Sequence, residues 1–444
     1  MAVDLLEKIR GRTVTVGIIG LGYVGLPFAV EFARAGVRVL GIDVDREKVE
    51  RVRRAESYIP DVPSAALEQV VRAGRLAAHD DYAPLREADA AFICVPTPFT
   101  RAKAPDISYV EAAARALSGV LHRDMLVVLQ STTYPGTTEE VVQPILEQSG
   151  LAVGRDFFLA FSPERIDPGN KVFGARNTPK VVGGVTAADA ERAAALFGLI
   201  IDPKQIHIVS GPRAAEMCKL LENTFRSVNI ALVNELAKLC DRMGLDIWEV
   251  IEAAATKPFG FMPFSPGVGV GGHCIPVDPY FLSWKAREYN FYTKFIELAA
   301  EVNQSMPYYT VHRLARALNE KGKPLKGARI LVLGAAFKRD IDDCRNSPAV
   351  EVLNILAQSG AAVCYNDPHV PKLTPGEHGL PPGLPALDSK PLTAELLAAM
   401  DCVLIAVRHS AYDVPWVVRH SRLVFDAQNA TRHLREGREK VVRL

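Results

Sequence analysis

One cysteine stands in a setting that suits nucleophilic chemistry. Cys274 lies in "GVGVGGHCIPVDP" (267–279), where glycines allow close backbone approach to a ligand and two prolines predict a helix beginning just after the cysteine. A helix N-terminus stabilises a thiolate, so Cys274 suits a nucleophile; the alternative is a small buried cysteine. Metal binding is not expected, because His273 adjoins Cys274 and no partner pair lies at ligand spacing. The other six cysteines are expected to be structural.

Charged and amide side chains with catalytic potential lie in two further segments. Lys219 and Asn223 are one helical turn apart, which suits oxyanion stabilisation or water positioning if their face looks into a cleft. The alternative is an exposed lysine beside a polar neighbour. In "FSPERIDPGN" (161–170), Glu164 suits a general base and Arg165 a fork for a carboxylate or phosphate. The alternative there is a solvated surface turn with an ion pair.

A glycine-rich turn near the N-terminus suits dinucleotide binding. In "GLGYVG", Gly20, Gly22 and Gly25 follow a strand-like run and precede a helical one, and Asp43 ends the next strand-like run. Such glycines let the backbone approach a pyrophosphate, while the carboxylate accepts from a ribose hydroxyl and repels a 2′-phosphate. NAD is therefore favoured over NADP. The alternative is that the glycines serve only a tight turn.

Two threonines follow later strand-like runs. Thr97 in "VPTP" (95–98) and Thr132 in "STTYPGT" (131–137) lie where loops at the carboxyl ends of a parallel sheet line a ligand crevice. They suit hydrogen bonds to a cofactor or a water, or are ordinary turn and cap residues.

The order of strand-like and helical runs along the chain predicts how these residues are positioned. It indicates an α/β protein with two Rossmann-like parallel-sheet domains joined by a central long-helix domain. Strand-like and helical runs alternate up to about residue 200, and unbroken helical periodicity follows from residue 212. "ARILVLGAAFKRD" and Asp367 then repeat the strand–turn–acid pattern, with Lys338 and Arg339 where glycines would admit a dinucleotide. The predicted domains are 1–205, 206–320 and 321–444, with a surface loop at 371–391.

Composition limits the class of protein. The 444 residues carry a formal net charge of +1 with 48% hydrophobic and 23% charged residues, typical of a globular protein without general attraction to nucleic acid or membrane. Neither a signal peptide nor an apolar run long enough to span a membrane is expected. Seven cysteines without a CxxC pair favour a reducing cytoplasm.

Taken in order, the motifs resemble one enzyme family over essentially the whole chain. "GLGYVGLP", "VPTP", "STTYPGT", "SPERIDPGN", "EMCKLLENTF", "GVGVGGHCIPVDP" and "GAAFKRDIDDCRNSP" are similar to those of NAD-dependent UDP-sugar 6-dehydrogenases. The residues then expected to contact NAD are Gly20, Gly22, Tyr23, Val24, Gly25, Asp43, Lys48, Pro96, Thr97, Thr132 and Arg345. Those expected to contact the UDP-sugar are Glu164, Arg165, Lys219, Asn223, Phe264, Gly271 and Lys338.

The resemblance also implies a mechanism, with oxidation of carbon 6 to a carboxylate by two NAD and no release of free aldehyde. Cys274 adds to the aldehyde, and the thiohemiacetal is oxidised to a thioester. Lys219 and Asn223 stabilise the alkoxide, and Glu164 acts in hydrolysis of the thioester. Asp278, with Lys219, organises a water or relays a proton, and Thr132 helps to hold that water. His273 has no catalytic role.

The resemblance favours UDP-N-acetyl-D-glucosamine as substrate, with UDP-N-acetyl-D-mannosamine or UDP-glucose as alternatives. The UDP-glucose branch typically has a hydrophobic residue where Arg165 stands, and the loop 261–272 is expected to close over the sugar. The family further implies a homodimer through the central helices and a role in polysaccharide biosynthesis. Two competing hypotheses are a non-catalytic NAD sensor and a two-electron alcohol dehydrogenase, and both leave Cys274 without a function.

Overall fold

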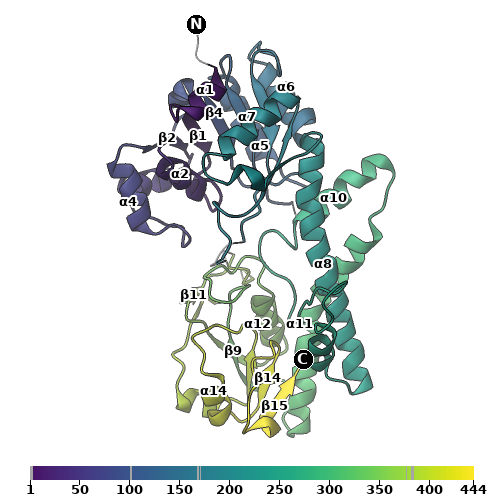
Figure 1. Ribbon diagram of the computed structural model, residues 1–444. Helices are drawn as coiled ribbons and strands as arrows, with labels where there is room; N and C mark the ends of the chain where they lie inside the picture. Colours follow the sequence, from purple (N-terminus) through teal and green to yellow (C-terminus); the bar gives the residue numbers. More distant parts are fainter. Residues whose placement is uncertain (1–3, 101–102, 168–169, 171, 377, 382–384) are drawn as a thin grey trace. The chain divides into compact units, whose positions relative to one another are not determined.

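The computed structural model describes residues 4–100, 103–167, 170, 172–376, 378–381 and 385–444 (Figure 1). The chain divides into two compact units, Met1–Glu222 with Tyr280–Phe291, and Asn223–Pro279 with Tyr292–Leu444. The three-domain division at 1–205, 206–320 and 321–444 stays a prediction, and its central segment contributes residues to both units. No helix in the described ranges is long and apolar enough to cross a membrane.

The first unit is built on an eight-stranded sheet of order β3-β2-β1-β4-β5-β6-β7-β8. Its strands are β1 (Thr15–Ile19), β2 (Arg38–Ile42), β3 (Leu76–His79), β4 (Ala90–Ile93), β5 (Leu126–Leu129), β6 (Phe158–Phe161), β7 (Lys180–Gly184) and β8 (Ile206–Ile208). Neighbouring strands are parallel except β6 and β7, which are antiparallel. Every residue of β1 is buried, as expected for a parallel strand covered by helices on both faces.

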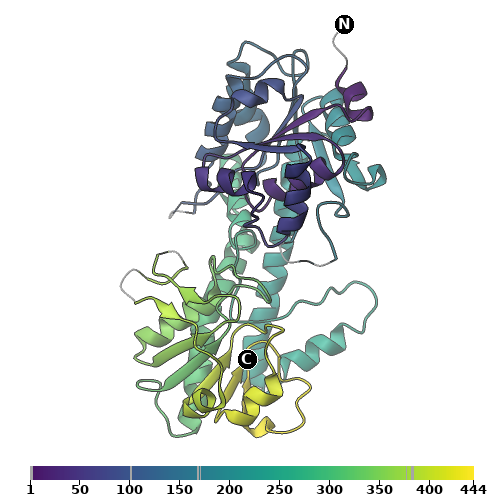
Figure 2. The same cartoon turned by 90° about the vertical axis from the view of Figure 1, so that its left-hand side faces the viewer.

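Helices cover both faces of this sheet (Figures 1 and 2). The helices of this unit outside α8 (Pro212–Met243) and α10 (Asp278–Ala286) are α1 (Leu5–Arg10), α2 (Gly25–Arg34), α3 (Arg46–Arg53), α4 (Ser64–Arg72), α5 (Ser108–Ser118), α6 (Gln143–Glu147) and α7 (Ala187–Phe197). Its short helical turns are η1 (Ala83–Glu87), η2 (Thr138–Val142), η3 (Pro203–Gln205) and η4 (Arg287–Tyr289). One core joins the sheet to α1, α2, α4 and α7, and a second core joins its other face to α5 and α6. The expected α/β class is confirmed.

Local sequence signals explain where several of these helices begin and end. Asp45 caps α3, since its side chain accepts from amides of the first helical turn. Thr186 and Asp189 form a reciprocal capping box at the start of α7. Gly36 follows α2 with a φ of +96°, a conformation that favours glycine and stops the helix.

The expected long helix is α8 (Pro212–Met243), 32 residues that begin in the first unit and continue in the second. It is followed by α9 (Ile247–Ala254), α10 (Asp278–Ala286) and α11 (Lys294–Glu320). The segment between α9 and α10 carries the glycine-rich stretch. The helix expected just after Cys274 begins about one turn later, at Asp278, because residues 275–277 form a turn.

The second unit contains a parallel five-stranded sheet of order β10-β9-β13-β14-β15. Its strands are β9 (Arg329–Leu333), β10 (Ala362–Asn366), β13 (Cys402–Ile405), β14 (Val424–Asp426) and β15 (Val441–Arg443), and its other elements are α12 (Pro348–Gln358), α13 (Ala394–Ala399), α14 (Val414–His420) and η5 (Arg438–Lys440). One core joins the sheet to α11 and α12, and another joins it to α13 and α14. The expected loop at 371–391 includes the short antiparallel pair β11 (Lys372–Leu373) and β12 (Leu387–Asp388), while 377 and 382–384 lie outside the described residues.

Candidate active site

The dinucleotide turn has the backbone that its glycines predict. Gly20 has a φ of +93°, and a Cβ there would lie 2.6 Å from the carbonyl oxygen of Cys94. A Cβ on Gly25 would lie 1.8 Å from the carbonyl oxygen of Gly20, whereas a Cβ on Gly22 would meet nothing within 4 Å. Gly20 and Gly25 therefore serve the fold. Open space lies over Gly22, where the backbone can take a pyrophosphate.

Asp43 fixes this turn and fits the ribose of a dinucleotide. Its Oδ2 accepts from the Leu21 amide at 2.8 Å and its Oδ1 from the Asp45 amide at 2.9 Å. Lys48 Nζ lies 3.9 Å from Asp43 Oδ2. Because each carboxylate oxygen has two lone pairs, Asp43 keeps acceptor capacity for a hydroxyl. These residues fit NAD.

Other residues expected to contact the cofactor lie in segments that follow adjacent strands. Tyr23 is exposed and Val24 is the N-cap of α2, both after β1. Pro96 is exposed and Thr97 buried after β4, and Thr132 is half-buried after β5. Because β1, β4 and β5 are neighbours in a parallel sheet, these segments share its carboxyl edge, the ligand-binding edge of such folds.

Glu164, which follows β6, is 7% exposed, so it is not in a solvated turn. Its Oε1 accepts from the amides of Arg165 and Ile166, each at 2.7 Å. Its Oε2 accepts from Gln130 Nε2 and Lys180 Nζ, each at 2.9 Å. Four donors thus hold one buried carboxylate in place.

Lys219 and Arg165 join this cluster to the first turns of α8. Lys219 is buried, and its Nζ donates to the carbonyl oxygen of Glu164 at 2.7 Å. Arg165 donates to the Pro179 carbonyl at 2.8 Å and pairs with Glu222 on α8 at 2.7 Å. Arg165 therefore anchors the loop that carries Glu164, with part of its guanidinium committed to Glu222.

Farther along α8, Asn223 binds the start of α10. Asn223 Nδ2 donates to Asp278 Oδ2 at 2.5 Å, and both side chains are buried. Two residues later, the ring of Phe225 meets that of Phe264 edge-on, with centroids 5.9 Å apart. The helix pair expected from sequence is thus matched by a partner from the segment after Cys274.

Cys274 is exposed, and its carbonyl oxygen accepts from the amides of Val277 and Asp278 at 3.0 and 2.8 Å. Burial instead raises the thiol pKa of Cys344 and of Cys402 to about 12. Burial also raises the thiol pKa of three further cysteines, Cys94, Cys218 and Cys364. The exposed position of Cys274 therefore sets it apart from cysteines whose thiols burial keeps neutral.

The glycines before Cys274 pack against the turn that follows β9. A Cβ on Gly271 would lie 2.6 Å from Phe337 Cβ. The Gly272 amide donates to the Arg345 carbonyl at 3.0 Å, and Asn346 Nδ2 donates to the Gly272 carbonyl at 3.0 Å. Arg345 itself forms a two-pronged contact with Asp343, with nitrogen–oxygen distances of 2.6–3.0 Å. The glycines thus have a packing reason that the sequence alone did not reveal.

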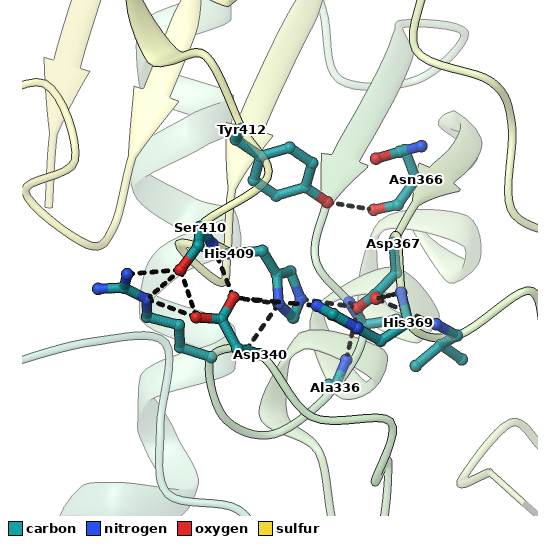
Figure 3. A network of polar contacts seen from close by, with 11 residues as sticks. Ala336, Asp340, Asn366, Asp367, His369, His409, Ser410 and Tyr412 are labelled. Atoms are coloured by element: carbon teal, nitrogen blue, oxygen red, sulfur yellow. Dashed lines mark hydrogen bonds and ion pairs between the residues drawn. The ribbon is translucent and has the colours of Figure 1, made fainter. Parts of the chain in front are cut away.

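A buried network supports the second Rossmann-like turn (Figure 3). Asp367 Oδ2 accepts from the amides of Ala335 and Ala336 at 2.7 and 3.0 Å. The same oxygen contacts Nε2 of His409 at 3.0 Å, and His409 Nδ1 accepts from the Asp340 amide at 2.9 Å. His409, which is 1% exposed, is therefore in the tautomer with its proton on Nε2.

Asp340, His369 and His409 have potential ligand atoms within 4.8 Å of one another. The contact of His409 with the Asp367 carboxylate also resembles the carboxylate contacts of metal-binding histidines. A metal at His409 Nδ1 would nevertheless displace the Asp340 amide, which already uses that lone pair. We therefore assign the network to support of the turn and derive no metal chemistry from it.

The same network holds Asp340 in a left-handed conformation, with φ of +59°. Its Oδ1 accepts from the Ser410 amide at 2.7 Å, and its Oδ2 accepts from Arg339 Nε at 3.0 Å and from the Ser410 hydroxyl. Partial burial alone would raise the pKa of Asp340, but the hydrogen bonds from Ser410 and Arg339 outweigh it and lower the pKa to about 2. Lys338 lies in this turn, two residues before Asp340.

Sequence reasoning did not find Lys180, Gln130 or His409. Lys180 and Gln130 had weak signals, a lysine opening the apolar run "KVVGG" and a glutamine ending the apolar run "MLVVLQ". Both are almost fully buried, which is unusual for these residue types. The structure brings Glu164 and Lys219 together in the first unit, and Asn223 with Asp278 and Gly272 with Arg345 in the second.

Three family models match successive parts of the chain. Residues 14–201 match the NAD-binding domain, 213–305 the central domain and 331–433 the UDP-binding domain of the UDP-glucose/GDP-mannose dehydrogenase family.

Individual relatives match over most of their length. A UDP-N-acetyl-D-glucosamine 6-dehydrogenase of Pseudomonas aeruginosa is 37% identical, covering 90% of this chain and 92% of the relative. A UDP-N-acetyl-D-mannosamine dehydrogenase of Escherichia coli strain K12 is 35% identical, covering 90% and 94%. The solved structure of a UDP-D-ManNAc dehydrogenase of Pyrococcus horikoshii superposes with a TM-score of 0.84 at 32% identity, covering 95% and 96%.

Proposed function

The chain belongs to the UDP-glucose/GDP-mannose dehydrogenase family, and from this premise we propose that it oxidises carbon 6 of UDP-N-acetyl-D-glucosamine to the carboxylate. It is an NAD-dependent UDP-sugar dehydrogenase. The observation that favours an N-acetylhexosamine over glucose is Arg165 in "SPERIDPGN", because the UDP-glucose branch typically has a hydrophobic residue there. Relatives named for the gluco and the manno sugar are 37% and 35% identical to this chain, so the choice of the gluco epimer rests on the likeness of "SPERIDPGN" and the Cys274 segment to the branch that acts on UDP-N-acetyl-D-glucosamine.

The first oxidation needs a base and a stabilised alkoxide. Bound NAD accepts the hydride in each of the two oxidations. We assign stabilisation of the alkoxide to the ammonium of Lys219 and the amide of Asn223. We assign to Asp278 and Thr132 the binding of the water that takes up the proton. The hydrogen bond from Asn223 to Asp278 supports the roles of these two residues, because it fixes the orientation of the Asn223 amide.

Cys274 then holds the sugar between the two oxidations. Its sulfur bonds to carbon 6 of the aldehyde, and the thiol proton goes to the carbonyl oxygen, giving a thiohemiacetal. Loss of a hydride and a hydroxyl proton leaves a thioester on Cys274. Water then adds to the thioester, the carbon–sulfur bond breaks, and the sulfur regains a proton. The sum is one alcohol, two NAD and one water giving one carboxylate, two NADH and three protons.

We assign the hydrolytic step to Glu164, as the base that orients the water. Its burial and its ordered carboxylate support this role, although the four donors described above already occupy the oxygens. A water must therefore exchange with one of the two side-chain donors on Oε2 during the step.

A panel of UDP-sugars with NAD tests the assignment. The expected result is two NADH per UDP-N-acetyl-D-glucosamine, with slower turnover of the manno and glucose analogues. One NADH per sugar with free aldehyde would refute the mechanism. Cys274→Ser is expected to abolish steady-state turnover while leaving NAD binding intact. Faster turnover of UDP-N-acetyl-D-mannosamine would favour the second candidate, which the 35% identity to the Escherichia coli relative supports.

We also propose a cytoplasmic homodimer formed through the central helices. Phe225, Leu232, Leu236, Leu239 and Met243 recur at helical spacing on α8 and are each exposed by 39–61%. A stripe of this kind on a monomer favours association with an apolar partner. Light scattering on a size-exclusion column is expected to give twice the chain mass, and Leu232→Arg is expected to lower it.

A further inference from the structure

Lys180 is a buried lysine that, within the described part of the chain, forms its ion pair with Glu164. It opens β7 and is 1% exposed. Its Nζ donates to Glu164 Oε2 at 2.9 Å and to the Pro163 carbonyl at 3.3 Å. A buried ammonium is costly unless it is paired and hydrogen-bonded, so its position depends on the carboxylate it meets.

Two aromatic rings also contact the Lys180 ammonium. Lys180 Nζ lies 4.4 Å from the ring centroid of Phe28 and 5.4 Å from that of Phe197. Phe28 belongs to α2, the helix that follows the dinucleotide turn, and Phe197 ends α7. Cation–π contacts of this kind are strongest when water is excluded. The ammonium is therefore held by the core and cannot swing toward solvent.

Glu164 links Lys180 to a residue with a proposed catalytic role. The carboxylate of Glu164 accepts a hydrogen bond from the Lys180 ammonium, and the backbone carbonyl of Glu164 accepts one from the Lys219 ammonium. Two cations thus hold one residue at two points. Lys180 also donates to the backbone carbonyl of Pro163, so loss of Lys180 would loosen the backbone next to the Glu164 carbonyl that orients Lys219.

We propose that Lys180 is a positioning residue that holds the Glu164 carboxylate in its orientation and, through the backbone at Glu164, orients Lys219. This inference rests on the proposed role of Glu164. Burial lowers the pKa of Lys180, and the charge and hydrogen bond of Glu164 raise it again, which is the behaviour of a mutually dependent pair.

The test is the pH profile of turnover for Lys180→Met, which keeps the length of the side chain and removes its charge. NADH formation is followed from pH 5 to 9 at saturating NAD and UDP-sugar, with thermal melting at each pH. We expect kcat to fall and the acid limb of its pH profile to move upward, because the charge beside the catalytic carboxylate is lost, with partial recovery of the rate at alkaline pH. Lys180→Arg retains the charge and is expected to keep the limb near its original place.

Two controls separate positioning from packing. Lys285 is another buried lysine of the first unit, paired with Glu140 and Glu288 at 2.7 and 2.6 Å. Lys285→Met is expected to lower the melting temperature without moving the acid limb. If Lys180→Met does not fold, Gln130→Leu takes its place, because it removes a neutral donor from the same Glu164 oxygen and moves the limb upward by less.

The outcomes separate this inference from the proposed function. Glu164→Gln with unchanged turnover would overturn the role of Glu164. If Glu164→Gln is impaired but Lys180→Met lowers only the melting temperature, with the acid limb in place, the positioning role of Lys180 is refuted. Loss of the Lys180→Met effect in the Glu164→Gln background would support it, since the two residues then act as one unit.

Discussion

Replacing Gly22 with alanine separates the binding role of the dinucleotide turn from its structural role. The added methyl group would meet nothing within 4 Å, and the backbone there is outside the left-handed region. Without NAD, we therefore expect stability to be unchanged or to rise by about 0.4–1 kcal/mol, because alanine restricts the unfolded chain. The fold has no reason to reject this side chain.

With NAD, the same methyl group stands in the open space assigned to the pyrophosphate. If the phosphate is pushed away from one backbone amide, a charge-assisted hydrogen bond worth about 1.5–3 kcal/mol is lost. That equals a rise in Kd of about 10- to 140-fold. At an NAD concentration of about 100 times the wild-type Kd, NAD stabilises the wild-type protein by about 2.7 kcal/mol. A 100-fold weaker variant keeps only about 0.4 kcal/mol of this.

Isothermal titration calorimetry gives the Kd, and thermal melting with and without NAD gives the stability change. Gly25→Ala is the structural contrast, because its Cβ would lie 1.8 Å from the Gly20 carbonyl oxygen and the protein is expected to melt early even without NAD. Gly119→Ala is the neutral control, since its Cβ would lie 3.5 Å from the Ala116 oxygen, an ordinary contact.

If Gly22→Ala binds NAD with the same Kd as the wild-type protein, the reasoning is refuted, because a phosphate would then not occupy the space over Gly22. The reasoning would fail equally if Gly22→Ala lowered the melting temperature without NAD as much as Gly25→Ala does. In that case the turn itself, rather than the ligand, would require the glycine.

Further predictions concern the second unit. Gly271→Ala places a Cβ 2.6 Å from Phe337 Cβ, so we expect a loss of about 1–3 kcal/mol in urea unfolding and a higher KM for the UDP-sugar, with the Kd for NAD retained. His409→Ala leaves the Asp340 amide without its acceptor and is expected to cost about 1–3 kcal/mol in the same assay. The folded-state pKa of Asp340, about 2, is below its unfolded value of 3.8, so its contribution to stability is present above pH 4 and is lost as pH falls toward 2; Ser410→Ala is expected to weaken this acid-side dependence in melting curves.

Features encoded in short stretches were predictable from sequence. The Gly20–Gly25 turn and Asp43 belong to one strand–helix–strand unit, so spacing along the chain fixes their spacing in the fold. The length of α8 followed from 32 residues whose only proline is the first, before Gly244. The resemblance to UDP-sugar dehydrogenases also followed from ordered motifs, and the family is confirmed.

Contacts between distant segments were not predictable. Glu164 meets Gln130 and Lys180 because the strands or loops that carry them follow one another across the sheet, and no periodicity encodes which side chain fills a buried gap. His409 reaches Asp367 across 42 residues for the same reason. A sequence shows that a lysine or histidine is present, but only its neighbours decide whether it is solvated or buried.

The sequence by itself determined the dinucleotide turn, the long helix, the family and the residue types available for catalysis, because each rests on local pattern. Only the tertiary structure decided how those residues are held. It showed that Glu164 is buried among four donors, that Asn223 binds Asp278, and that Gly271 packs against Phe337. The physical reason is that desolvation and close contact arise only when distant segments are brought together by the core.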